Sequence, residues 1–179
     1  METIYLFHDR EESPDKLEKL EEILKNALPP TNILRPYLPH IHPGLKIEDS
    51  YHHIMDKFDV SRTSAIIGVG WGGLLAAKLQ EDLAANWNST PRHFKVIALA
   101  APTMEGNIVL TKRLPDRRAL YSSQDKTIQP RTNWSDFAEA YEYTPLLFHD
   151  IEANSYMLAY LIKTWLSGKN VEQEILSLK

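Results

Sequence analysis

The sequence predicts a three-layer α/β domain, in which helices cover both faces of a mostly parallel β-sheet. Short runs of continuous apolar residues recur along the chain, as is typical of strands that are buried on both faces. Most of these runs are separated by segments with apolar residues at helical spacing, which favours helical crossovers between parallel strands. With 179 residues and no repeat or linker, the chain is expected to form one domain over residues 1–179.

The first half of the chain begins with a strand and a capped helix. Residues 4–7 (Ile-Tyr-Leu-Phe) form an apolar run that predicts the first strand. Ser13 is a favourable N-cap and Pro14 suits the first helical position, so a helix is expected over residues 14–27. The elements expected next are a strand at 32–34, a loop rich in Pro and His at 36–44, and a helix at 48–58.

The part of the chain after residue 60 contains the two most apolar strand candidates. Residues 64–69 predict a strand, which leads through a glycine-rich turn into a helix at 74–87. Residues 94–101 are the longest apolar run. The remaining expected elements are strands at 119–122 and 145–148 and helices at 134–141 and 153–166. In sheets of this kind, ligands bind outside the carboxyl ends of the strands, so the residues that follow each strand are the candidates for a site.

Composition excludes several classes of protein and site. Twenty basic and 24 acidic residues give a net charge of −4, so the chain lacks the basic footprint of a nucleic-acid-binding domain. The absence of cysteine excludes disulfides, thiolate metal sites and cysteine nucleophiles. No apolar run is long enough to span a membrane and no signal peptide is seen. We therefore expect a cytoplasmic protein that contacts neither nucleic acid nor membrane, with a small molecule as the expected partner. Its oligomeric state is not specified by the sequence.

The segment after the third predicted strand carries a resemblance to a known family. Residues 66–77 read Ile-Ile-Gly-Val-Gly-Trp-Gly-Gly-Leu-Leu-Ala-Ala, which resembles the nucleophile elbow of the α/β hydrolases, Gly-x-Ser-x-Gly between a strand and a helix. Gly68, Trp71, Gly72 and Gly73 match the elbow as many members of the family have it, whereas Gly70 stands at the position of the serine. The resemblance implies a small α/β-hydrolase-like domain without a lid.

The other parts of the catalytic machinery follow in the order of that family. By this resemblance, Asp125 corresponds to the acid and His149 to the base of a catalytic triad. His8 and Asp9 follow the first strand, where the family has a His-Gly turn that contributes to the oxyanion hole, and Trp71 would line the same pocket. Asp9 replaces the glycine of that turn, so a carboxylate is placed where negative charge would have to be stabilised.

A glycine at the nucleophile position removes the chemistry of acyl transfer. Gly70 has no hydroxyl, so no acyl-enzyme can form on it. Glycine also relieves the strain of the elbow conformation. The sequence thus predicts a degenerate hydrolase-like protein that binds a small molecule. Two alternatives remain: an esterase-like hydrolase in which His149, oriented by Asp125, activates water, and an interaction protein that uses only the scaffold.

Simpler interpretations apply to several of these residues. Asp125 is also suited to a turn that it caps through its own side chain, and His149 to a hydrogen-bonded structural role. The glycines at 68, 70 and 73 fit a dinucleotide fingerprint, but the next strand does not end in the acidic residue that this fingerprint requires. Seven histidines without a metal-binding spacing lead us to predict no metal and no other cofactor. The basic residues between 112 and 118 are expected in a solvated loop.

Overall fold

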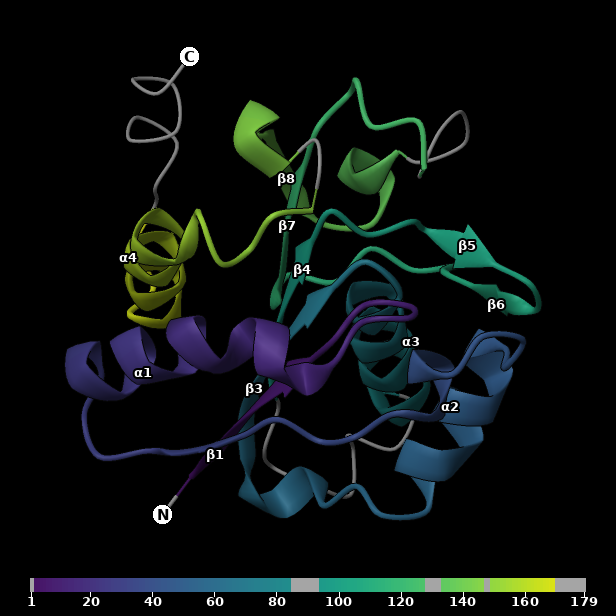
Figure 1. The fold of residues 1–179 in the computed structure, drawn as a ribbon, viewed down its shortest axis with the longest axis horizontal. Coiled ribbons are helices and arrows are strands. Elements are labelled where there is room, and N and C mark those ends of the chain that lie inside the picture. Colours follow the sequence, from purple (N-terminus) through teal and green to yellow (C-terminus); the bar gives the residue numbers. More distant parts are fainter. Residues whose placement is uncertain (1, 85–93, 128–132, 147–148, 170–179) are drawn as a thin grey trace.

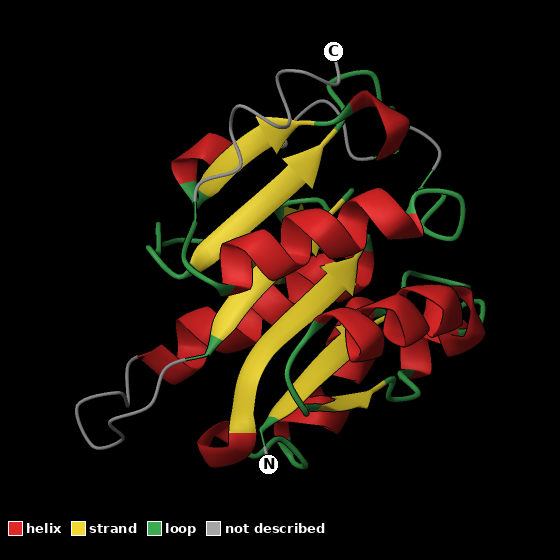
Figure 2. Ribbon diagram, turned by 90° about the vertical axis from the view of Figure 1, so that its left-hand side faces the viewer, coloured by secondary structure: helices red, strands yellow, loops and turns green. Residues whose placement is uncertain are grey.

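The computed structural model describes residues 2–84, 94–127, 133–146 and 149–169. Its centre is a six-stranded sheet in the order β2-β1-β3-β4-β7-β8, in which every neighbouring pair is parallel. The strands are β1 (Thr3–Phe7), β2 (Asn32–Leu34), β3 (Thr63–Val69), β4 (Lys95–Leu99), β7 (Arg117–Tyr121) and β8 (Glu139–Glu142). Figure 2 shows their common direction. The fold class expected from the sequence is therefore confirmed.

The α-helices of the described residues lie on both faces of the sheet (Figure 1). They are α1 (Glu18–Ala27), α2 (Ile47–Met55), α3 (Trp71–Ala84) and α4 (Ser155–Leu166), with α1 and α4 on one face and α2 and α3 on the other. One apolar cluster joins α1 and α4 to side chains such as Ile67 on β3. A second cluster joins α2 and α3 to the neighbouring residue Ile66. Successive strand residues point to opposite faces, so continuous apolar strands supply both cores.

Local signals in the sequence placed several elements correctly. Ser13 caps a short 3-10 helix, Pro14–Leu17, by accepting a hydrogen bond from the amide of Asp15, and α1 follows directly. The helix after β3 begins at Trp71, three residues earlier than expected, because the tight turn at Gly70 starts it immediately. In the described residues, the connections between strands contain no inserted lid domain.

Two expected elements near the end of the sheet were wrong. Residues 134–141 were expected to be helical, but they form a short 3-10 helix, Trp134–Asp136, and then enter β8. Pairing with the free edge of β7 satisfies the backbone of this segment in place of helical hydrogen bonds. Residues 145–148 were expected to be a strand, but a 3-10 helix, Thr144–Leu146, occupies the described part. Pro145 lacks the N–H that a strand ladder needs, and residues 147–148 lie outside the described residues.

Two further features were not expected. A small antiparallel hairpin, β5 (Met104–Glu105) and β6 (Ile108–Val109), follows β4. Two-residue strands are too short to show an alternating pattern. Arg117 was expected in a solvated loop, but it is fully buried on β7, where its guanidinium donates to Gln80 and to the carbonyl of Ala77.

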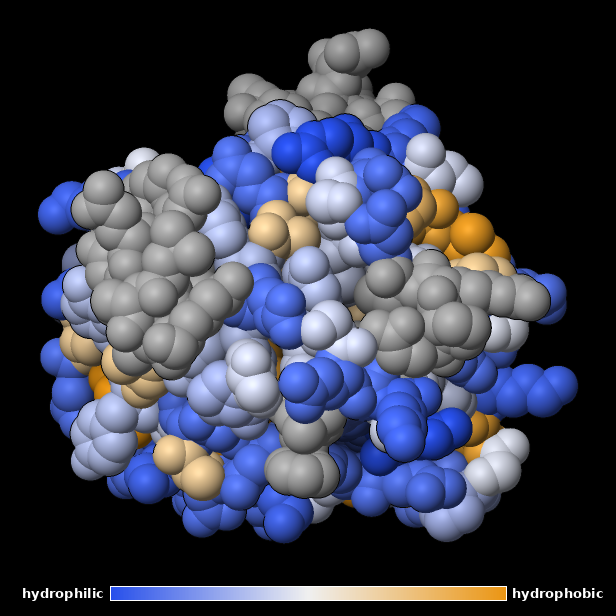
Figure 3. Space-filling model, turned by 90° about the horizontal axis from the view of Figure 1, so that it is seen from above, coloured by the Kyte–Doolittle hydropathy of each residue, from blue (hydrophilic) through white to orange (hydrophobic). Residues whose placement is uncertain are grey.

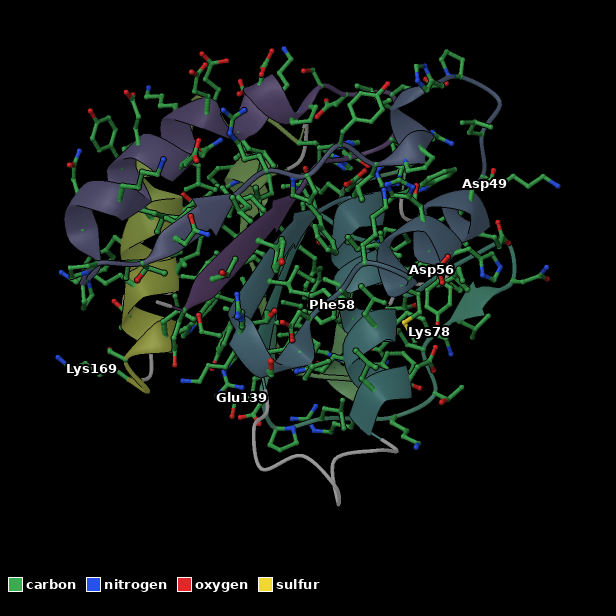
Figure 4. All side chains as sticks on the ribbon, turned by 90° about the horizontal axis from the view of Figure 1, so that it is seen from below. Asp49, Asp56, Phe58, Lys78, Glu139 and Lys169 are labelled. Carbon is green, nitrogen blue, oxygen red and sulfur yellow. The ribbon has the colours of Figure 1, made fainter. Side chains whose placement is uncertain are left out.

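The amino ends of the strands form the lower face of the molecule (Figure 4). Phe58 lies on this face, after α2, and its ring packs against the rings of Tyr5 and Phe94. This aromatic group closes one end of the core. The loops at the carboxyl ends are left to form the site.

Candidate functional site

The carboxyl ends of three strands bring the expected site residues together. Asp9 follows β1, Gly70 follows β3 and Asp125 follows β7, and His149 comes from the loop after the 3-10 helix Thr144–Leu146. Parallel strands end at one edge, which is why residues from four distant segments meet there. The face seen from above in Figure 3 is mostly hydrophilic.

Gly70 forms the sharp turn between β3 and α3. Its φ is +55°, a conformation that glycine adopts without the cost that a Cβ brings. Close packing beside this turn depends on a second glycine, because a Cβ on Gly72 would lie 2.4 Å from the carbonyl oxygen of Phe7. The start of α3 therefore approaches the end of β1 closely, and the residues that follow β1 reach Gly70.

The side chain of Asp9 fills the space beside Gly70. A Cβ built on Gly70 would lie 1.9 Å from Oδ1 and 2.2 Å from Oδ2 of Asp9. Oδ1 accepts hydrogen bonds from the backbone amides of Trp71, at 2.9 Å, and Arg10, at 2.7 Å. The Trp71 amide also lies at the positive end of α3, where a carboxylate is favoured. Asp9 thus places a negative charge where an elbow serine would carry its hydroxyl.

His149 lies between two carboxylates. Its Nδ1 donates to Oδ2 of Asp9 at 2.9 Å, and its Nε2 donates to Oδ2 of Asp125. Burial alone would lower the pKa of His149, but the hydrogen bonds and charges of Asp9 and Asp125 raise it to about 9. The ring is therefore a cation at neutral pH, with both nitrogens donating. Its backbone has a φ of +55°, which is unusual for a residue with a side chain.

The two carboxylate oxygens of Asp125 bind different partners. Its side chain is 1% exposed, and its Oδ1 accepts hydrogen bonds from the amide and the hydroxyl of Thr127 at 2.9 and 2.6 Å. The turn-capping interpretation and the contact with His149 therefore both hold, through different oxygens. The imidazole of His149 has the opposite orientation to that of the serine-protease triad, in which Nε2 faces the nucleophile and Nδ1 faces the acid. Here Nδ1 faces the position beside Gly70 and Nε2 faces Asp125.

The side chain of His8 is buried away from the site. Its Nδ1 donates to the carbonyl of Asp9 and its Nε2 accepts from the amide of Leu38, while His40 donates from Nε2 to the carbonyl of His8. Burial lowers the pKa of His8, which fits a neutral ring with one donor and one acceptor nitrogen. His8 thus supports the backbone beside Asp9 and does not line the cavity described next.

A small cavity of about 160 Å³ opens at this charge cluster. Its walls include four expected residues, namely Asp9, Gly70, Trp71 and His149, and four others: Arg10, Glu11, Pro102 and Thr127. The guanidinium of Arg10 lies over the ring of Trp71, 4.9 Å from its centroid. Arg10 was not among the site residues expected from the sequence. Its position in the loop after β1 could have identified it, because residues that follow a strand are candidates for the site.

No three His, Asp or Glu side chains in the described part of the chain are arranged to hold a metal ion. None of the described helices has the length and apolar character needed to cross a bilayer. Glu12 lies next to the charge cluster, and burial, followed by the charge of Asp9, raises the pKa of its carboxyl group.

Comparison with solved structures defines the class of this fold. No protein-family model matches the sequence, and no curated protein matches it. The ydeN gene product from Bacillus subtilis superposes with a TM-score of 0.64 at 11% identity, over 93% of this chain and 100% of that one. RedJ, a thioesterase from the prodiginine biosynthetic pathway in Streptomyces coelicolor, gives 0.57 at 11% identity, over 89% and 88%.

An extracellular α/β-hydrolase from a Paenibacillus species gives a TM-score of 0.52 at 10% identity, over 90% of this chain and 98% of that one. The chain therefore has the α/β-hydrolase fold. At this level of identity the likeness establishes the fold alone, so the function has to be argued from the site.

Proposed function

We propose that this chain is a binding protein on an α/β-hydrolase scaffold and does not form an acyl-enzyme. The observation that carries the proposal is the position of Asp9, whose carboxylate lies where the side chain of a nucleophile on residue 70 would be. The space of the missing serine is not an empty pocket but is filled by a charged group with hydrogen-bonded partners.

Acyl transfer needs a nucleophile and a base that can take its proton. Gly70 supplies no nucleophile. His149 has no free lone pair at neutral pH, because both nitrogens donate to carboxylates and its pKa is raised to about 9. Two of the requirements are therefore absent, and they are absent for separate reasons.

The backbone amides that would stabilise an oxyanion already donate to a carboxylate of the protein itself. The Trp71 amide follows the nucleophile position and the Arg10 amide follows β1, which are the two places from which this fold draws its oxyanion-hole amides. Both donate to Oδ1 of Asp9. A tetrahedral intermediate would have to displace this carboxylate before it could be stabilised.

A binding role is supported by a cavity that stays open at this edge of the sheet. The cavity beside His149 retains about 160 Å³ and is lined by cationic, anionic and aromatic side chains. A protein that used only the scaffold would not require this cavity. A binding role for a small polar molecule follows from the cavity and the charges that line it.

Direct activation of water by His149 is the second candidate, supported by its contact with Asp125 and its place in the cavity wall. It requires the neutral ring. Any hydrolysis by this route should therefore rise with pH along a titration centred near the pKa of about 9. Activity that is already at its plateau at pH 7 would exclude this form of the mechanism.

The test compares hydrolysis of p-nitrophenyl acetate and butyrate by the wild type with that by Gly70→Ser, Asp9→Gly and the double variant Asp9→Gly/Gly70→Ser. We expect the wild type and Gly70→Ser to be inactive, since a serine at 70 would collide with Asp9. The double variant should gain ester hydrolysis and labelling by a fluorophosphonate, because both the space and the amide donors become available.

His149→Ala in the wild-type background is the control for background hydrolysis. Turnover by the wild type at neutral pH that is lost in His149→Ala would overturn the proposal and favour catalysis. An inactive but folded double variant would contradict the argument that Gly70 and the Asp9 carboxylate are what prevents acyl transfer at this site.

A further inference from the structure

A second, larger cavity shares three residues with the candidate site. It has a volume of about 470 Å³, and Arg10, Glu11 and Trp71 line both cavities. This volume falls within the range of small-molecule sites, roughly 300–1,000 Å³. Its other walls are residues 44–48, at the start of α2, and residues 105–107, at the turn of the β5–β6 hairpin.

The wall formed by the hairpin is tied to α2. Oε1 of Glu48 accepts a hydrogen bond of 2.7 Å from the amide of Asn107, and Figure 1 shows α2 and the hairpin side by side. The same bond, with a second one inside the helix start, lowers the pKa of Glu48. Glu48 is therefore committed to holding the cavity together and is not free for a ligand.

Other charged groups in this cavity are unpaired. Neither the guanidinium of Arg10 nor the carboxylates of Glu11 and Glu105 have a hydrogen bond or ion pair within the described ranges, and the same is true of the ammonium of Lys46. Arg10 is preorganised by its stacking over Trp71 at 4.9 Å. The lining thus offers two cations and two carboxylates that a ligand can use.

We propose that this cavity binds a zwitterionic α-amino acid with a large apolar side chain. Its carboxylate would pair with the Arg10 guanidinium, whose planar fork matches a carboxylate, and its ammonium group with Glu105 or Glu11. Its side chain would lie against Trp71, Leu45 and Ile47, which supply the apolar part of the wall. The inference rests on the proposed binding function and names the class of ligand.

The balance of charge favours a zwitterion over other small ligands. A simple anion would meet Arg10 but would also face the carboxylates of Glu11 and Glu105, and a simple cation would face Arg10 and Lys46. Like charges in the cleft disfavour both alternatives. Only a ligand that carries both a positive and a negative charge can pair with the cations and with the carboxylates of the cavity.

The experiment uses four probes that share a phenylethylamine framework and differ in which charged groups they carry: L-phenylalanine, N-acetyl-L-phenylalanine, phenethylamine and N-acetyl-L-phenylalanine amide. Binding is followed by NMR chemical shifts of the Trp71 indole N–H in the ¹⁵N-labelled protein, assigned with Trp71→Phe. The variants are Arg10→Gln and Glu105→Gln, with Arg62→Gln as the matched control because Arg62 is exposed and lies at the amino end of β3.

We expect saturable shifts with L-phenylalanine and at least tenfold weaker binding of each of the other three probes. Arg10→Gln should weaken binding of L-phenylalanine about tenfold, whereas Arg62→Gln should not change it. Glu105→Gln should weaken binding of the probes with an ammonium group and strengthen binding of N-acetyl-L-phenylalanine, because one like charge that faces its carboxylate is removed.

Equal affinity for all four probes, or shifts with none of them, would overturn this inference. The affinities for the four probes are measured independently of the ester assay. Wild-type hydrolysis would refute the proposed function without changing the probe selectivity, and lost selectivity would refute the ligand class without restoring acyl transfer.

Discussion

Oδ1 of Asp9 lies 1.9 Å from the point at which residue 70 would carry its Cβ. Gly70 and Asp9 are therefore complementary, since one lacks the side chain whose space the other fills. The same carboxylate accepts hydrogen bonds from the amides of Arg10 and Trp71 and from His149. A change at either residue should consequently depend on the residue present at the other.

Gly70→Ala should destabilise the protein by about 2–4 kcal/mol. The added methyl collides with Asp9, and a positive φ of 55° adds strain for a residue with a Cβ. In an Asp9→Gly background the collision is removed, so the cost should fall by at least about 1 kcal/mol, which a double-mutant cycle by urea denaturation measures. Additive losses would show that the two positions are independent.

Gly168→Ala is the matched control for this cycle. Gly168 also has a positive φ, +82°, but nothing lies within 4 Å of its added Cβ. Its cost should reflect strain alone, about 1 kcal/mol, and should be the same in the wild-type and Asp9→Gly backgrounds.

His149 should make the stability of the protein fall between about pH 6.5 and 9. Its pKa is raised to about 9 in the folded protein by Asp9 and Asp125. Below its unfolded pKa the ring is charged in both states and its stabilisation is fully present. As the pH rises towards 9 the unfolded chain loses the proton first, so the stabilisation is lost, in total about 3 kcal/mol.

The measurement is the free energy of unfolding as a function of pH for the wild type and for His149→Gln. The variant should lack this part of the slope. If the free energy of unfolding of His149→Gln depended on pH as that of the wild type does, the titrating group would be a residue other than His149. Direct NMR titration of the ring should give the same midpoint near 9.

Local patterns predicted most of the strands and the loops that follow them, but not the contact that defines the site. Apolar runs such as residues 64–69 identify buried strands because both faces must be covered. The edge strand β8 was missed because Glu139–Glu142 is half exposed and has no apolar run. Its pairing with β7 depends on a free sheet edge, which local sequence does not encode.

The contacts of Asp9 and His149 also could not be predicted from local sequence. The sequence placed both at the expected edge of the sheet. It could not show that the Asp9 carboxylate turns back over Gly70, because that contact joins two loops 61 positions apart and depends on the close approach at Gly72. The pairing of His149 with both acids likewise depends on a positive φ that only the assembled loop determines.

Arg117→Met should cost about 3–5 kcal/mol of stability. Arg117 is fully buried and pairs with Glu81 at 3.6 Å, and burial lowers its pKa to about 10. Removal of the cation leaves the Glu81 carboxylate buried without its charge partner. Thermal or urea unfolding should show this loss, and Arg117→Met/Glu81→Gln should recover part of it.

Arg118→Gln provides the comparison on the same strand. Arg118 pairs with Glu139 at 3.1 Å, but both side chains are partly exposed to solvent. Its removal should change stability by less than about 1 kcal/mol. A large loss at Arg118 and a small one at Arg117 would contradict the role of burial.

His40 should produce the opposite pH dependence on the acid side. Burial lowers its pKa to about 4, while its Nε2 donates to the carbonyl of His8. The unfolded chain therefore binds a proton near pH 6.5 that the folded protein does not accept until about pH 4, so stability falls by about 3 kcal/mol as the pH decreases across this window. Replacement by Gln, which can keep the donor but does not titrate, should flatten the slope between pH 6.5 and 4. If the slope persisted in His40→Gln, another buried group would have to carry it, and His8, whose pKa burial also lowers, would be the next residue to replace.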